Sequence, residues 1–170
     1  NFNDIDIIVV SKDNLSEKSI EDITKIKTHL IVIDNKALIK GLSTDPLYQM
    51  MLSKCITKKR FVYKLKHKIN YKILDLHLLK SEILIDNFDY LNGDEKYYLS
   101  RNMIAIYLYL QNKKVNKDGV DREIKFIFNL KDIKEIKLNM LDKNKFLKKY
   151  KMIYKKIFDK IMKGIKNGTK

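Results

Sequence analysis

Two aspartates near the start of the chain have the type and spacing of metal ligands. Asp4 and Asp6 alternate with isoleucine in the run D-I-D-I-I-V-V. Because side chains alternate along a strand, both carboxylates are expected on one face, with Cα atoms about 6.6 Å apart. Two carboxylates this close repel each other unless a cation lies between them. Mg²⁺ typically takes one or two carboxylates and completes its shell with water and substrate phosphate. The spacing therefore predicts a Mg²⁺ site at Asp4 and Asp6; in the alternative interpretation, Asp4 only caps a turn and Asp6 is incidental.

The residues around this pair predict a small α/β unit. The β-branched run at 4–10 is typical of an interior strand, and so is H-L-I-V-I-D at 29–34. Ser16 can cap a helix through residue 27 that buries one apolar side. Strand, helix and strand in succession indicate two strands of one sheet. The next predicted elements are a helix at 36–42, a break at 43–46, a short helix at 46–54 and a short apolar segment at 61–63.

Three segments of this unit resemble a known family. The run N-D-I-D-I-I-V-V resembles the Asp-x-Asp strand of the DNA polymerase beta superfamily of nucleotidyltransferases, especially the minimal nucleotidyltransferases of archaea and bacteria. The segment H-L-I-V-I-D-N-K-A-L-I-K-G-L is similar to the next strand and helix of that family. D-P-L-Y-Q-M-M-L-S-K-C-I-T-K-K-R-F-V-Y is similar to the segment that often follows. The resemblance covers roughly residues 1–63 and implies a Mg²⁺-dependent transfer of a nucleoside monophosphate from an NTP.

The resemblance also implies two features that this chain does not match directly. In the active enzymes a third carboxylate, in the middle of the following strand, helps to hold the metal and to deprotonate the acceptor hydroxyl. This chain has Leu30, Ile31 and Val32 there, with His29 at the start of the strand. Asp34 is the candidate third residue if the register is shifted; otherwise it caps the strand end or the next helix. The family places a Gly-Ser pair just upstream of Asp-x-Asp, where it holds the nucleotide phosphates. This sequence starts too late to include that position, so either the natural start lies upstream or phosphate binding is lost.

Residues 64–170 are predicted to form a basic helical domain. Apolar residues recur at helical spacing at Ile73, Leu76, Leu79, Ile83 and Leu84, with Leu74 and Leu78 beside them. Residues 96–111 are apolar on almost all sides, and residues 120–130 are predicted to form a short amphipathic helix. The last predicted helix, 142–166, carries an apolar stripe that we expect to pack in the bundle. The stripe consists of Phe146, Tyr150, Ile153, Ile157, Ile161 and Ile165.

One polar pair in the central helix invites a second comparison. Arg101-Asn102 resembles part of HEPN domains, four-helix bundles in which an Arg-x4-His motif supports ribonuclease activity. Ile106 stands at the histidine position, so only the bundle architecture is carried over. The other interpretation is a polar patch that neighbouring carboxylates satisfy.

The net charge of +15 is unevenly distributed. Residues 1–56 carry seven lysines and eight acidic residues, whereas 57–170 carry 29 basic and 13 acidic residues. Only three basic residues are arginine, so sequence-specific reading of DNA is not favoured. The excess of lysine reflects either solvated helix faces or a phosphate-bearing partner.

The remaining signals bound the class of protein. Cys55 is the only cysteine, which excludes an internal disulfide and favours a cytoplasmic protein with Cys55 buried as a small hydrophobe. No His/Cys cluster suggests a transition-metal site; His67 is expected to face solvent and His77 to lie in the core. No apolar run is long enough to span a membrane.

The sequence thus predicts an α+β protein, with a partial nucleotidyltransferase-like α/β domain at 1–63 and a helical bundle at 64–170. The predicted function is a Mg²⁺-dependent, nucleotide-binding nucleotidyltransferase that moves an NMP to a hydroxyl acceptor through Asp4, Asp6 and Asp34. The alternative is a catalytically inactive relative that binds RNA or a protein partner through its basic helices. A third interpretation is a membrane-surface protein that uses its final helix.

Overall fold

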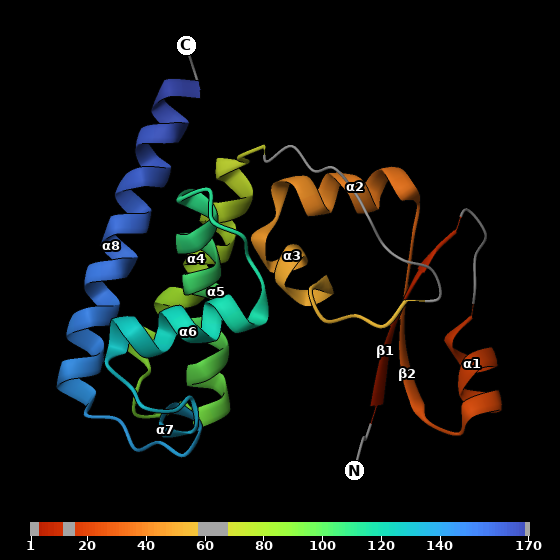
Figure 1. Cartoon of the computed structure of the whole chain (residues 1–170), viewed down its shortest axis with the longest axis horizontal. Helices are drawn as coiled ribbons and strands as arrows, with labels where there is room; N and C mark the ends of the chain where they lie inside the picture. The colour runs from red at the N-terminus through yellow and green to blue at the C-terminus, as the bar shows by residue number, and fades with distance from the viewer. Residues whose placement is uncertain (1–3, 12–15, 58–67, 169–170) are drawn as a thin grey trace. The chain divides into compact units, whose positions relative to one another are not determined.

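The predicted strand–helix–strand order is present in the structure, a computed structural model that describes residues 4–11, 16–57 and 68–168. Strand β1 (Asp4–Val10) is followed by α1 (Glu17–Thr24) and β2 (Lys27–Ile33), as Figure 1 shows. The two strands pair in parallel, from Asp4 opposite Lys27 to Val10 opposite Ile33. Helix α2 (Asn35–Thr44) begins directly after β2. The α/β order is therefore confirmed, in a mixed and mostly helical α+β protein.

The contacts divide the chain into two compact units, residues 1–42 and 43–170. The boundary predicted between residues 63 and 64 lies outside the described residues, and so does the predicted segment 61–63. That boundary stays a prediction, and the two units are described separately below.

Helix α1 contacts β2 through carboxylates rather than through the predicted apolar side. The amide of Thr28 donates to Glu21 Oε1 at 2.7 Å, and the amide of Leu30 donates to Glu17 Oε1 at 2.8 Å. Ile23 is 83% exposed, and Ser16 precedes the helix without a side-chain capping bond. The expectation of an apolar buried side was therefore wrong, whereas Ser16 stands at the predicted N-cap position but makes no side-chain capping bond. The two glutamates instead satisfy amides on the outer edge of β2, which would otherwise be open for pairing with another chain.

The strands are less buried than their β-branched composition predicts. Among the described residues the sheet has two strands, and Val10 and Ile31 are both 46% exposed. The interpretation of the two runs as fully buried strands was therefore wrong. An apolar run of this length indicates a strand, but it does not show how many neighbouring strands or helices bury that strand.

The second unit contains six helices among its described residues. They are α3 (Pro46–Leu52), α4 (Tyr71–Asp86), α5 (Gly93–Leu110), α6 (Lys117–Phe128), α7 (Lys134–Lys137) and α8 (Lys143–Gly168). Helix α5 begins with a capping box between Asn92 and Glu95 and buries 13 of its 18 residues. It contacts α3, α4, α6, α7 and α8, so the prediction of a central apolar helix is confirmed.

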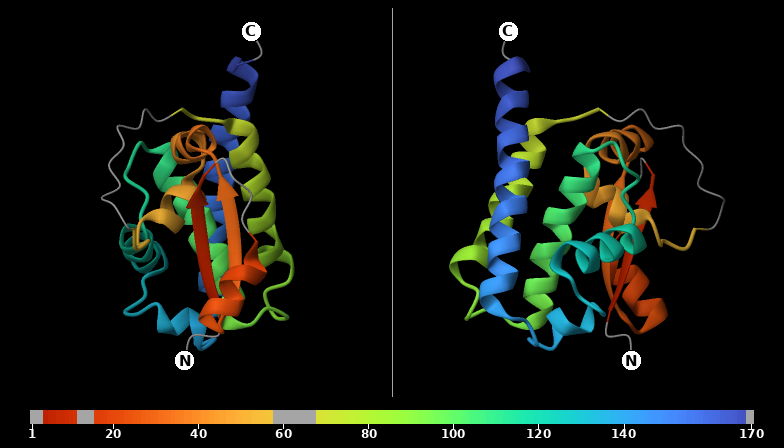
Figure 2. Two further views of the ribbon diagram at one scale, coloured as in Figure 1. Left: turned by 90° about the vertical axis from the view of Figure 1, so that its right-hand side faces the viewer. Right: turned by 60° about the vertical axis from the view of Figure 1, so that its left-hand side comes forward.

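The long final helix packs as its stripe predicts. Phe146, Tyr150, Ile153, Ile157 and Ile161 are at most 4% exposed, and Figures 1 and 2 show α8 running alongside α4. The Tyr150 hydroxyl donates to the Ser81 carbonyl of α4 at 2.9 Å. The rings of Phe128 and Phe146 stack at 4.4 Å between centroids, which joins α6 to α8.

Helix α4 buries one of its two apolar sides, and the expectation that Cys55 is buried was wrong. Helix α4 packs inward through Leu74, Leu78, Ser81 and Leu84, whereas Leu76, Leu79 and Ile83 face outward. A helix that is apolar on both sides gives no sequence signal for which side meets the bundle. Cys55 is exposed, because it follows the end of α3 rather than lying within it. No helix in the described ranges is long and apolar enough to cross a membrane.

Candidate functional site

The strand register places Asp6 opposite a histidine. Asp6 is the third residue of β1 and His29 the third residue of β2, and the two are partners in the parallel pair. Because partners in neighbouring strands point to the same face of a sheet, both side chains lie on one face. Both are exposed. A carboxylate and an imidazole therefore stand side by side on an accessible surface of the first unit.

Asp4 occupies the first position of the same strand. Its backbone pairs with Lys27 of β2, but its side chain lies outside what the structure describes. The prediction that Asp4 and Asp6 form a metal-binding pair therefore stays a prediction. The formation of β1 over residues 4–10 supplies the strand on which that prediction depends.

Asp34 lies far from Asp4 and Asp6 along the sheet. It follows Ile33, the partner of Val10, so it lies five positions beyond the level of Asp6. At about 3.3 Å per residue this separation is roughly 16 Å along the sheet, which no single metal ion can bridge. The Asp34 carboxylate instead accepts a hydrogen bond from the amide of Ala37 at 2.6 Å. Asp34 thus has the capping role that the sequence offered as its alternative.

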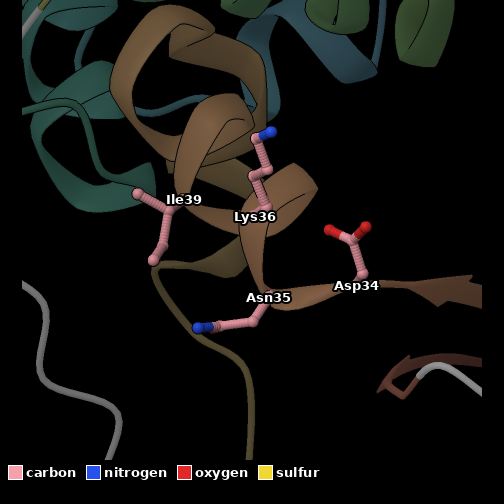
Figure 3. A pocket seen from close by; sticks show the side chains of 4 residues that line it. All are labelled: Asp34, Asn35, Lys36 and Ile39. Atoms are coloured by element: carbon pink, nitrogen blue, oxygen red, sulfur yellow. The ribbon is translucent and has the colours of Figure 1, made fainter.

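A shallow pocket adjoins Asp34 at the start of α2. Asp34, Asn35, Lys36 and Ile39 line it, and Figure 3 shows their side chains around the first turn of the helix. All four residues come from one continuous segment. Neither Asp6 nor His29 is among its lining residues, so we assign the pocket no function.

The ligand atoms on the face of the sheet that carries Asp6 and His29 determine which metal ion it can bind. In the described parts of the chain, no group of three or more His, Cys, Asp or Glu side chains is placed to hold a metal. The described pair consists of one carboxylate, Asp6, and one imidazole, His29. Mg²⁺ is commonly bound by one or two protein carboxylates with water and substrate phosphates, so the carboxylate of Asp6 is a donor that suits Mg²⁺, whereas His29 is not a ligand that Mg²⁺ prefers.

The α1 glutamates hold β2 from its outer side. The amides of Thr28 and Leu30, on either side of His29, donate to Glu21 and Glu17. Thr28 is only 2% exposed, and its hydroxyl donates to the Ile26 carbonyl at 3.0 Å. His29 therefore sits on a backbone that is fixed by β1 on one edge and by α1 on the other.

The helical unit contains one aspartate–histidine pair with a structural role. Asp45 accepts hydrogen bonds from the amides of Leu47 and Tyr48, which caps α3, and its second oxygen lies 3.1 Å from His77 Nε2. Burial raises the pKa of Asp45, but the hydrogen bond and charge of His77, with the two amides, outweigh burial and hold the pKa below its ordinary value. This pair ties α3 to α4, as expected for a core histidine with a partner.

Arg101 and its neighbours have no nuclease arrangement. Ile106, at the position of the HEPN histidine, is completely buried. The Arg101 guanidinium lies over the rings of Tyr97 and Tyr98, at 5.9 and 5.1 Å from their centroids. Arg101 forms no ion pair with a carboxylate of the described residues. The interpretation that neighbouring carboxylates pair with this polar patch was therefore wrong for Arg101, whose guanidinium packs on the tyrosine rings instead.

The outer face of α8 presents lysines without ion-pair partners. The helix carries ten lysines and one acidic residue, Asp159. Lys143 pairs with Asp89, Lys145 with Asp142, and Lys160 donates to the Leu110 carbonyl. Exposed lysines of this helix that pair with no carboxylate among the described residues are Lys148, Lys151, Lys155 and Lys163.

Comparisons of the whole chain with models of protein families, with curated proteins and with solved structures find no match. The candidate site therefore rests on its own geometry. Sequence reasoning missed the pairing of His29 with Asp6, because it began the second strand at His29 rather than at Lys27. The pairing depends on the strand register, and the apolar run in the sequence does not show that β2 begins at Lys27.

Proposed function

We propose that this protein is a Mg²⁺-dependent nucleotidyltransferase that transfers a nucleoside monophosphate from an NTP to a hydroxyl acceptor. The observation that carries the proposal is the exposed carboxylate of Asp6 on β1, two residues from Asp4, in a parallel strand–helix–strand unit. The resemblance of this segment to the Asp-x-Asp strand of nucleotidyltransferases supports the same activity.

The chemistry assigned to these residues is positioning and charge neutralisation. The Mg²⁺ ion would neutralise charge on the triphosphate when bound. Asp6 and Asp4 would hold it on one face of β1, and the exposure of Asp6 leaves that face open to a nucleotide and an acceptor. Asp34 has no part in this proposal, because it caps α2 at the far end of β2.

Transfer of labelled phosphate tests the proposal. The chain is incubated with Mg²⁺, α-labelled ATP and a panel of RNA, protein and small-molecule acceptors, beside Asp6→Asn. The matched control is Asp22→Asn, an exposed aspartate on α1 in the same unit. We expect transfer by the wild type and the control and none by Asp6→Asn. Equal transfer by Asp6→Asn, or no transfer by the wild type to any acceptor, would count against the activity.

A second candidate function is RNA binding through α8, as in an inactive relative of these enzymes. Lys148, Lys151, Lys155 and Lys163 support it, because they extend along about 22 Å of helix and form no ion pair among the described residues, with Asp159 the one acidic residue of the helix between Lys155 and Lys163. A phosphate backbone has the complementary charge and length. Binding by ion release makes affinity fall steeply with salt concentration.

Fluorescence anisotropy with single-stranded RNA over a salt series tests this second function. Replacing the four lysines by glutamine should lower the slope of log affinity against log salt by about 3, since each phosphate contact contributes about 0.7. Lys143→Gln/Lys145→Gln is the control, because both lysines already pair with carboxylates. A slope that the quadruple variant leaves unchanged would exclude α8 as the RNA surface.

A further inference from the structure

The strand face of the first unit carries a nitrogen donor beside its carboxylate. His29 and Asp6 are direct partners in the parallel register, and both are exposed on one face. Adjacent strands lie about 4.8 Å apart. The side chains of Asp6 and His29 can therefore both reach one cation that lies above the sheet. Metal–ligand distances of about 2.0–2.2 Å are compatible with this spacing.

The other charged residues near this face favour a site centred on Asp6 and His29. Lys27 is the strand partner of Asp4, so the positively charged residue of β2 lies opposite Asp4 and not opposite Asp6. Asp34 lies at the opposite end of β2 and caps α2. Of the described side chains, His29 is therefore the one that register places next to the carboxylate of Asp6.

The backbone of His29 is held in place before any ion binds. Glu21 and Glu17 of α1 accept hydrogen bonds from the amides of Thr28 and Leu30, and β1 pairs with the other edge. A ligand whose neighbours are fixed loses less conformational freedom on binding, and its geometry is reproducible. The fixed strand distinguishes His29 from a histidine on a loop.

We propose that His29, rather than Asp34, is the third ligand of the site at Asp4 and Asp6, and that its imidazole nitrogen makes the site prefer Mn²⁺ over Mg²⁺. This inference rests on the proposed function. Carboxylate and water suit Mg²⁺ and Mn²⁺ alike, whereas imidazole adds affinity for transition ions and little for Mg²⁺. A site with two carboxylates and one imidazole therefore binds both ions but not equally.

Direct Mn²⁺ binding tests the inference without relying on activity. Electron paramagnetic resonance of free Mn²⁺ gives the affinity of the 170-residue chain, with and without a non-hydrolysable ATP analogue, for the wild type, His29→Ala and His29→Asp. We expect His29→Ala to weaken Mn²⁺ binding by about tenfold or more and to change Mg²⁺ binding little. His29→Asp should restore binding and raise the affinity for Mg²⁺.

Lys27→Ala is the control, because Lys27 is an exposed neighbour on the same strand and face. Its loss removes a positive charge, so Mn²⁺ affinity should stay equal or increase. In addition, Mn²⁺ should broaden the ring resonances of His29 in the wild type, as assigned by their absence in His29→Ala. The broadening is measured on the wild-type protein, and the variant serves only to assign the resonances.

The failure of this inference differs from failure of the proposed function. If Asp6→Asn loses Mn²⁺ while His29→Ala keeps wild-type affinity and the His29 ring is not broadened, the third-ligand role is overturned and the aspartate site stands. If the wild type binds neither Mn²⁺ nor Mg²⁺ with the nucleotide, both proposals are wrong.

Discussion

Replacement of Gly93 by alanine is expected to destabilise the helical unit by about 2 kcal/mol. A Cβ atom at Gly93 would lie 1.9 Å from the carbonyl oxygen of Lys137 and 2.7 Å from that of Ile136. Carbon–oxygen contacts this short do not occur, and both obstacles are backbone atoms that no rotamer change can remove. Ile136 is completely buried, so α7 must shift by about 1 Å against the core.

The expected size combines two opposing effects. Overpacking of this kind costs about 1–3 kcal/mol or more, whereas alanine in place of glycine favours a helix by up to about 1 kcal/mol. At roughly 3 °C per kcal/mol for a chain of this size, the melting temperature should fall by about 6 °C. Thermal unfolding followed by circular dichroism at 222 nm gives the value.

Gly119→Ala is the matched control for this prediction. Its nearest obstacle is the side-chain oxygen of Asn116 at 3.1 Å, so a small adjustment suffices. The control should change the melting temperature by less than about 2 °C. A Gly93→Ala variant as stable as the wild type would refute the close approach of α5 and α7.

Three other predictions follow from contacts in the two units. The pKa of Asp45 is lowered in the folded state, so the stability that its carboxylate contributes is present above pH about 4 and is lost as the pH falls through the lowered pKa. Asp45→Asn should therefore flatten the acid part of the curve of unfolding free energy against pH. Glu21→Ala should speed hydrogen exchange of the Thr28 amide by about tenfold in an NMR experiment, and unchanged exchange would contradict the edge contact with α1. Cys55 is exposed, so the native protein should react with one equivalent of a thiol reagent as fast as the unfolded protein; protection would contradict its position after α3.

The elements with one strong periodicity could be predicted from the sequence. The strand at 4–10 was placed with its boundaries, and the α8 stripe from Phe146 to Ile161 is buried as expected. Each of these segments has one apolar pattern and therefore one interpretation. Helix α4 has apolar residues on both sides, so its sequence does not show that Leu74 and Leu78 face the core whereas Leu76 and Leu79 face outward.

The candidate site could be predicted only within one strand. Alternation along β1 relates Asp6 to Asp4, but no local pattern reports which residue of β2 lies opposite Asp6. The register depends on where β2 begins, and β2 begins two residues earlier than the apolar run suggests. The role of α1 was missed for a related reason, since no local pattern shows that Glu17 and Glu21 accept hydrogen bonds from the amides of β2.

Calorimetric titration of the chain with Mg²⁺ and a non-hydrolysable ATP analogue tests the central claim most directly. We expect saturable, metal-dependent binding by the wild type and by Asp22→Asn, and loss of that binding in Asp6→Asn. Identical isotherms for the wild type and Asp6→Asn, or no heat of binding in any of the three, would contradict a nucleotide site on the β1 face.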